Sequence, residues 1–248
     1  MKKNILIATG LLLFSGAAIA QNNTNSISQS GDENKAEVTQ QGETGAMSSD
    51  NTAEVTQLGT ANEAVVNQSN GSSDNSATTI QIGLDNSSQQ EQSDESSGNV
   101  ALIVQVGQLN KASHTQVDGS TDNYAVITQI GNNNDATQHQ SGLTDGNLAV
   151  VTQTGNDNTA EQHQLNSTSL NNASISQTGD FNDGYQRQEN ADGGNIAILI
   201  QEGNYNQSRQ IQEGTNHTST VTQLGTKHNA SINQAGQNNS VTITQKNN

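Results

Sequence analysis

One repeated frame runs through almost the whole chain and limits what it can fold into. The frame is N-x5-Q-x-G-x2-N-x5-Q, and it reads NYAVITQIGNNNDATQHQ at 123–140 and NLAVVTQTGNDNTAEQHQ at 147–164. Its closing glutamine recurs nineteen times from Gln29 to Gln245, which gives nine and a half repeats, mostly of 22 to 24 residues. Fixed periods of this length are typical of solenoids, in which each unit packs only on its neighbours.

Each seven-residue segment alternates with the period of a β-strand. In 147–153 the odd positions are Asn147, Ala149, Val151 and Gln153, and they face one way. The glycine two residues after each Gln permits the positive φ of a tight turn. The four-residue link is too short to cross over within one sheet, so it must join two facing strands. The sequence therefore predicts an all-β fold, a two-sheet parallel β-solenoid with amyloid-like cross-β stacking and about 9.5 repeats of two strands each.

The composition alone would indicate disorder, with 29% hydrophobic residues, a mean hydropathy of -0.75 and a net charge of -16. Stacked layers change that conclusion, because identical amides about 4.8 Å apart can hydrogen-bond to one another inside the stack. We therefore expect the periodic Asn and Gln side chains to be core residues.

The candidate site residues are two amide ladders and a row of turn glycines. The first-strand ladder is Asn51, Gln57, Asn75, Gln81, Asn99, Gln105, Asn123, Gln129, Asn147, Gln153, Asn171, Gln177, Asn195 and Gln201. The second-strand ladder is Asn62, Gln68, Asn86, Gln92, Asn110, Gln116, Asn134, Gln140, Asn158, Gln164, Asn182, Gln188, Asn206 and Gln212. The turn glycines are Gly59, Gly83, Gly107, Gly131, Gly155, Gly179, Gly203, Gly214, Gly225 and Gly236.

The two kinds of strand differ at the fifth position and on the outer face. First strands carry an apolar residue at position 5, as at Ile127, whereas the middle second strands carry Gln, as at Gln138, with His114 in its place once. The outer face of the first strands is rich in Val, Leu and Ile, and that of the second strands is charged. An apolar outer face over several layers indicates a surface for lateral association.

The chain starts with a processing segment. Residues 1–20 hold Lys2 and Lys3, an apolar run and small residues at Ala18 and Ala20, as in a secretory signal peptide. We expect residues 21–50 to form an N-terminal segment with a first, less regular repeat, and 51–248 to form the regular solenoid. Loss of the two lysines takes the charge from -16 to -18, which argues against nucleic acid as a partner. The sequence contains no second apolar segment that would suggest an integral membrane protein. A secreted protein is therefore expected.

The frame resembles the curlin repeat, S/N-x5-Q-x-G-x2-N-x5-Q, of curli fibre subunits, and the match runs from Asn23 to Gln245. The resemblance is strongest to the major curlin subunit. It implies a secreted functional amyloid: an extracellular, cell-surface, homopolymeric fimbrium of the biofilm matrix that serves adhesion. It also implies a nucleator subunit and an outer-membrane secretion channel as partners, and no cofactor.

Some features depart from that family pattern. The chain has nearly twice the usual number of curlin repeats, and its frame starts almost at the cleavage site, where curlins carry a glycine-rich export signal. His217 and His228 replace the leading Asn of two late strands, and we expect them to interrupt the amide ladder. The first and last strands are both of the first kind, so a head-to-tail junction would lack one second-kind strand. Neither end has a capping segment of its own, which predicts stacking of subunits through their ends.

Other functions fit the sequence less well. The chain has no Cys and no recurring Ser, His and Asp set, so an enzyme is not expected. The acidic turns lack the spacing of calcium-binding β-rolls, and His139 and His163 form only a pair, so no metal site is expected. Two alternatives stay open: a minor, nucleating curlin subunit, and a monomeric binding solenoid such as an adhesin or an ice-binding protein.

Overall fold

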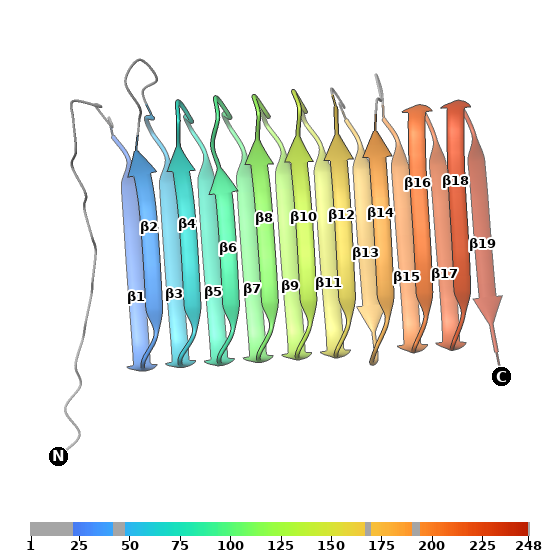
Figure 1. Ribbon diagram of the computed structural model, residues 1–248, viewed down its shortest axis with the longest axis horizontal. Coiled ribbons are helices and arrows are strands. Elements are labelled where there is room, and N and C mark those ends of the chain that lie inside the picture. The colour runs from blue at the N-terminus through green and yellow to red at the C-terminus, as the bar shows by residue number, and fades with distance from the viewer. Residues whose placement is uncertain (1–21, 42–47, 167–169, 190–193, 248) are drawn as a thin grey trace.

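Every regular element in the described part of the protein is a β-strand. The computed structural model describes residues 22–41, 48–166, 170–189 and 194–247, and the predicted signal peptide lies outside these residues. Odd-numbered strands form a ten-stranded sheet and even-numbered strands a facing nine-stranded sheet, stacked along one axis (Figure 1). No helix with the length and hydrophobicity that a membrane crossing needs occurs among the described residues.

The first sheet consists of β1 (Thr24–Asp32), β3 (Thr52–Thr60), β5 (Ser76–Leu84), β7 (Val100–Gln108), β9 (Tyr124–Asn132), β11 (Leu148–Asn156), β13 (Asn172–Thr178), β15 (Ile196–Asn204), β17 (Thr218–Thr226) and β19 (Ser240–Lys246). The second sheet consists of β2 (Lys35–Gln41), β4 (Glu63–Ser69), β6 (Ser87–Gln92), β8 (Lys111–Val117), β10 (Asp135–Ser141), β12 (Thr159–Leu165), β14 (Asp183–Glu189), β16 (Gln207–Thr215) and β18 (Asn229–Gln237).

All neighbouring strands are parallel and in register, so each residue lies on its equivalent one layer away. Gln105 of β7 pairs with Gln81 of β5 on one side and Gln129 of β9 on the other. Because the side-chain period of a strand is 2, this register keeps every inward residue on the inner face in all layers. The predicted two-sheet parallel β-solenoid is thereby confirmed.

The links between facing strands contain two residues with positive φ. One is the predicted glycine: Gly131 has a φ of 126°, and a Cβ there would collide with the carbonyl oxygen of Gly155 in the next layer. The other is the residue immediately before each Asn, such as Asn133 with a φ of 55° and Tyr205 with a φ of 58°. This second position could not be recognised from the sequence, because its occupants include Asp, Asn, Leu, Phe and Tyr.

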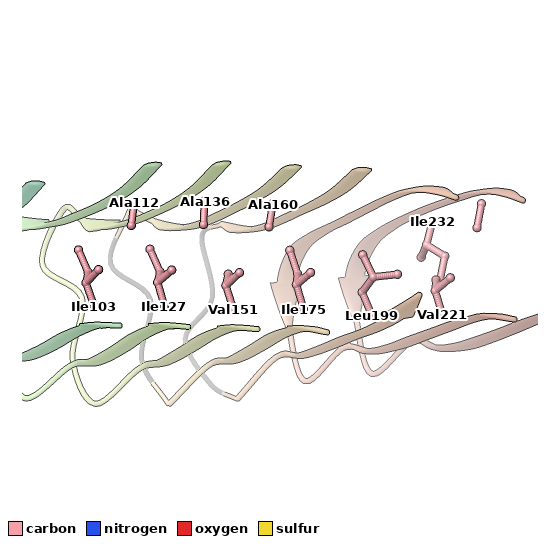
Figure 2. Close-up of a cluster of buried hydrophobic side chains, with 11 residues drawn as sticks. Ile103, Ala112, Ile127, Ala136, Val151, Ala160, Ile175, Leu199, Val221 and Ile232 are labelled. Atoms are coloured by element: carbon pink, nitrogen blue, oxygen red, sulfur yellow. The ribbon is translucent and has the colours of Figure 1, made fainter. Parts of the chain in front are cut away.

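The main hydrophobic cluster contains one large side chain from the first sheet in each of its layers. Ile103, Ile127, Val151, Ile175 and Leu199 of the first sheet point toward small residues of the second, among them Ala112, Ala136 and Ala160 (Figure 2). In these layers a large residue of the first sheet thus faces a small one of the second, whereas nearer the C-terminal end the cluster also contains Ile232 of the second sheet. A second cluster around Val55 and Val66 lies nearer the N-terminus. Thr79, which is buried and whose hydroxyl has no partner, stands at position 5 between the two clusters.

Gly184 shows how closely the two sheets fit. It stands where the neighbouring layer has Ala160, and a Cβ added to it would lie 2.7 Å from Cδ2 of Leu199 and 3.2 Å from Cγ2 of Ile175. Leucine branches one carbon later than isoleucine or valine, so Leu199 reaches further across the core. The glycine makes room for that longer reach.

We expect Gly184→Ala to lower the free energy of unfolding by about 1–3 kcal/mol, a typical cost of overpacking a core. In a Leu199→Ile background the loss should shrink, because that pair would copy the Ala160–Ile175 arrangement one layer earlier. Urea unfolding of the two single variants and the double variant measures the coupling. Additive effects would show that Leu199 is not the reason for the glycine.

Candidate functional site: the buried amide ladders

Glutamine side chains form two continuous hydrogen-bonded columns, one in each sheet. In the first, Nε2 of Gln57 donates to Oε1 of Gln81 at 2.8 Å, and the same bond leads from Gln81 to Gln105 at 2.9 Å. In the second, Gln116 donates to Gln140 at 2.8 Å and Gln140 to Gln164 at 2.7 Å. All donors point toward the C-terminal end of the stack, so each column has a direction.

The second proton of each amide holds the sheets and links together. Nε2 of Gln57 also donates to the carbonyl oxygen of Lys35 at 2.9 Å and that of Asn62 at 3.0 Å. These carbonyls belong to β2 of the facing sheet and to the link that leads into β4. A glutamine therefore bonds both along the stack and across it, and its removal would leave several buried groups without partners.

The asparagine columns bond differently from the amide-to-amide contacts that we expected. In the first sheet, Oδ1 of Asn51 accepts the backbone N–H of Asn75 at 3.0 Å, and Nδ2 of Asn75 donates to the carbonyl oxygen of Ser96 at 3.0 Å. In the second sheet, Nδ2 of Asn86 does donate to Oδ1 of Asn62 at 2.9 Å, but it also donates to the carbonyl oxygen of Gly107 at 3.0 Å. The asparagines thus mainly satisfy the backbone of the turns, whereas the glutamines bond to one another.

Every ladder amide that the sequence singled out is buried. The first-strand and second-strand members, from Asn51 to Gln201 and from Asn62 to Gln212, are each at most 1% exposed. The turn glycines all have positive φ, and Gly31, which sequence analysis left out, shares that geometry. The site is therefore a linear interior that extends through all layers, with no pocket at its centre.

A row of turn hydroxyls was missed. Ser48, Ser72, Ser96, Ser120 and Thr144 are buried at equivalent turns. Nδ2 of Asn99 donates to Oγ of Ser120 at 3.2 Å and to its carbonyl oxygen at 2.8 Å, so the row anchors the asparagine column. The signal was present in the sequence as a Ser or Thr three residues before each of these first-strand asparagines.

His217 continues the ladder, contrary to our expectation of an interruption. Its backbone N–H donates to Oδ1 of Asn195 at 2.7 Å, and its Nδ1 accepts the backbone N–H of Asn239 at 3.2 Å. Nε2 lies 3.1 Å from the carbonyl oxygen of Glu213 and, since a carbonyl only accepts, must carry the proton. The neutral imidazole thus supplies one acceptor and one donor where asparagine supplies Oδ1 and Nδ2.

A third column, at position 5 of the second sheet, is broken by His114. Gln138, Gln162 and Gln186 bond in sequence at 2.7 and 2.9 Å. Nε2 of His114 lies 3.2 Å from the carbonyl oxygen of Leu102, while His114 Nδ1 and Oε1 of both Gln90 and Gln138 have no partner. Burial lowers the pKa of His114 from 6.5 to about 4, against a smaller upward effect of the Leu102 contact. The ring is therefore neutral near pH 7.

The outer surface of the second sheet carries two neighbouring histidines. The rings of His139 and His163 lie 6.0 Å apart between centroids and are tilted by 53°, and His163 pairs with Glu161. No group of three or more His, Cys, Asp or Glu residues suited to a metal ion occurs among the described residues.

The ends of the stack leave ladder atoms without their usual partners. Within the described residues, Nε2 of Gln234 donates to the carbonyl oxygen of Thr218 at 3.1 Å and Nε2 of Gln245 to that of Asn229 at 2.8 Å, but neither reaches another glutamine. At the other end, among the described residues, Oε1 of Gln29 accepts no glutamine Nε2, and Oε1 of Gln40 accepts only Nδ2 of Asn25, at 3.4 Å. One end thus presents donors and the other acceptors.

Two stretches of the chain match the model of the curlin associated repeat, at residues 49–83 and 220–246. These stretches cover β3 to β5 near one end of the solenoid and β17 to β19 at the other. A comparison with curated proteins gave no significant match.

We expect His114→Gln to rejoin the position-5 column and to raise the free energy of unfolding by about 1–3 kcal/mol near pH 7.5, since buried unpaired groups are costly. A histidine whose folded pKa is below its unfolded value loses stability as the pH falls through 6.5 toward 4. Between pH 7.5 and 5 that loss should be about 2 kcal/mol greater in the original protein than in the variant.

His114→Leu is the matched control, because it is similar in size but has no hydrogen-bonding group. It should remove the acid sensitivity without rejoining the column. Urea unfolding at the two pH values measures both effects. Equal stability of the Gln and Leu variants would contradict the repair of the column.

Proposed function

This chain is a curlin-repeat protein, and from that premise we propose that it is a structural subunit of extracellular, curli-like amyloid fibres. Its activity in this proposal is self-assembly: the C-terminal end of one solenoid stacks on the N-terminal end of the next. The observation that carries the proposal is the complementarity of the two ends of the amide ladders.

At both ends the ladder glutamines lack one partner that they would have inside the stack. Inside the stack, a glutamine Nε2 meets the Oε1 of the next layer at each step, as from Gln223 to Gln245 at 2.8 Å. The donors of Gln234 and Gln245 at one end would meet the acceptors of a second copy in the same geometry. A new copy therefore forms bonds at the junction that it already forms within itself.

The backbone edges follow the same direction. The N–H of Thr218 in β17 donates to the carbonyl oxygen of Asn239, one residue before β19, at 2.9 Å, so the even positions of the frame point toward the C-terminal end. In β19 these positions are Ser240, Thr242 and Thr244, and within the described residues no further strand pairs with them. Unpaired parallel edges of this kind are templates for another strand.

The resemblance to curlins supports the remaining parts of the proposal. Export through a signal peptide and an outer-membrane channel, a nucleator subunit, and roles in biofilm and adhesion belong to that family picture. Regular repeats throughout the solenoid favour the major, fibre-forming role over the nucleating one. A monomeric binding solenoid is the alternative from another class.

Purified protein at rising concentration should form filaments after a lag phase. Added seeds should shorten the lag phase. Fibre diffraction should show a meridional reflection at about 4.8 Å. A soluble β-rich monomer that persists at all concentrations would favour the monomeric alternative and overturn the proposal.

Thr242→Pro tests the edge directly. It removes an N–H that points out of the stack and places a ring on the open edge, so elongation should slow at least about tenfold while the monomer stays folded. Thr242→Val keeps the N–H and is the matched control. Elongation rates come from seeded growth, and folding from circular dichroism. Unchanged elongation of the proline variant would argue against growth through β19.

The outer face of the first sheet supports lateral association of filaments. Its outward side chains are mostly aliphatic and only half-buried by their neighbours above and below: Val100, Leu102, Val104, Val126, Leu148, Val150, Ile198 and Ile200. On the second sheet the outward positions carry charged residues such as Lys111, Asp135 and Asp183. A two-faced filament of this kind would bundle through its apolar side.

Val150→Lys combined with Ile198→Lys should therefore give single, unbundled filaments. The matched control places the same two charges on the opposite face, by Thr137→Lys with Thr159→Lys, and should leave bundles intact. Electron microscopy at equal ionic strength distinguishes the two. Bundles that persist in the first variant would exclude this face as the contact.

A further inference from the structure

Building on the proposed end-to-end stacking, we infer that successive subunits in the fibre are related by half a turn about the solenoid axis. In this junction β1 of the next copy stacks on β18, and its β2 stacks on β19. First-sheet strands of one subunit thus continue the second sheet of its neighbour. The inference deepens the proposed function, because it identifies the surface through which one copy recognises another.

The reason lies in the uneven ends of the two sheets. Among the described residues the first sheet runs from β1 to β19 and the second from β2 to β18, so the second sheet stops half a layer before the first at the C-terminal end. Figure 1 shows β19 extending past β18 at that end. At the N-terminal end β1 and β2 complete a layer together.

A junction without rotation would leave a gap. If β1 of the next copy paired with β19, its β2 would lie two layers from β18, or about 9.6 Å, instead of one. Both strand edges would then be unpaired inside the fibre, and buried unpaired backbone groups are strongly disfavoured. Half a turn removes the gap, because β1 fills the vacant half-layer over β18 and β2 follows over β19.

The backbones of β18 and β1 suit this pairing. Both strands are nine residues long and include the turn glycine, Gly236 in β18 and Gly31 in β1. In the half-turn junction, equal positions of the frame place Gln29 of the next copy beside Gln234, and Ile27 of the next copy beside Ile232. The links that follow are also equal in length, so the link after β1 can stack on the link after β18.

The core residues allow a first-sheet strand to stack on a second-sheet strand at the ends of the solenoid but not in its middle. In the middle, position 5 is aliphatic in the first sheet and Gln in the second, as at Ile127 and Gln138, so exchanged sheets would stack unlike residues. At the ends both sheets are aliphatic there: Ile27 and Val38 at one end, Ile232 and Ile243 at the other. Half a turn therefore puts aliphatic on aliphatic in both columns.

Two features of the β18 end fit the presence of another layer. A Cβ on Gly236 would meet nothing within 4 Å, whereas one on Gly214, in the layer before it, would collide with the carbonyl oxygen of Gly236. Nε2 of His228 lies 3.0 Å from the carbonyl oxygen of Leu224, as the same atom of His217 does from Glu213. Within the described residues Nδ1 of His228 has no donor, and half a turn would bring the backbone N–H of Asn23 to it, as Asn239 comes to His217.

Disulfide mapping tests the rotation, and the chain is suited to it because it contains no Cys. Position 4 of the frame points outward in every strand, and equivalent residues in adjacent layers are about 4.8 Å apart between Cα atoms, within the range for a disulfide. Half a turn places Ser26 of the next copy beside Ser231 of the copy before it. A junction without rotation places it beside Thr242.

We would therefore compare Ser26→Cys with Ser231→Cys against Ser26→Cys with Thr242→Cys. Both pairs are outward-facing, and both lie at opposite ends of one chain, so any bond joins two subunits. Arg209→Cys with Ser231→Cys is the positive control, because these residues are neighbours within one chain. Fibres are grown under reducing conditions, oxidised, dissolved in denaturant and examined for covalent multimers.

The expected result is a ladder of covalent multimers for the Ser26–Ser231 pair and monomers for the Ser26–Thr242 pair. The reverse pattern, or monomers from both pairs in well-formed fibres, would overturn the half-turn while leaving the proposed fibre function standing. Absence of fibres from the unsubstituted protein would overturn both.

A second measurement uses growth rates. Ser231→Pro alters the edge of β18 as Thr242→Pro alters that of β19, and a half-turn junction needs both edges. Elongation should therefore slow at least about tenfold in each variant. If only the β19 variant slows while the Ser231→Pro monomer stays folded, β18 does not take part in the junction.

Discussion

A buried amide must find hydrogen-bond partners, and the rest of this structure depends on that requirement. Asn and Gln fill interior positions where most proteins place aliphatic residues. The free-energy cost of burying these amides is offset only if each one meets another group at hydrogen-bonding distance. Stacking identical layers supplies that group at every step. The repeat, the parallel register and the fixed glycines all serve to bring one amide onto the next, as in the column from Gln57 through Gln105.

In the proposed fibre the same bonds would form both when the chain folds and when one copy adds to the next. Because the donors of each glutamine column point one way, the stack has a direction and two complementary ends. A second copy would extend the ladder with contacts that the chain already forms internally. Such an interface needs no separate binding site, and its specificity comes from frame length, link length and the size of the residue at position 5.

Local departures from the frame show which parts are constrained. His217 keeps the column intact because its ring offers one acceptor and one donor at the required places, whereas His114, in the middle of a glutamine column, leaves its own Nδ1 and Oε1 of Gln138 without partners. Gly184 yields space to Leu199. In each case the cost or gain follows from a single neighbouring layer, as expected for a solenoid in which contacts are nearly one-dimensional.

The sequence by itself determined the strands, their inward and outward faces, the two facing sheets and the burial of Asn and Gln. These follow from period 2 within a segment and from links too short for any other connection. Only the tertiary structure decided that Asn51 bonds to the backbone of Asn75, that residues such as Asn133 adopt positive φ, and that His217 continues the asparagine column. These features depend on which atoms of adjacent layers meet, and that contact is fixed by the stacking of whole turns.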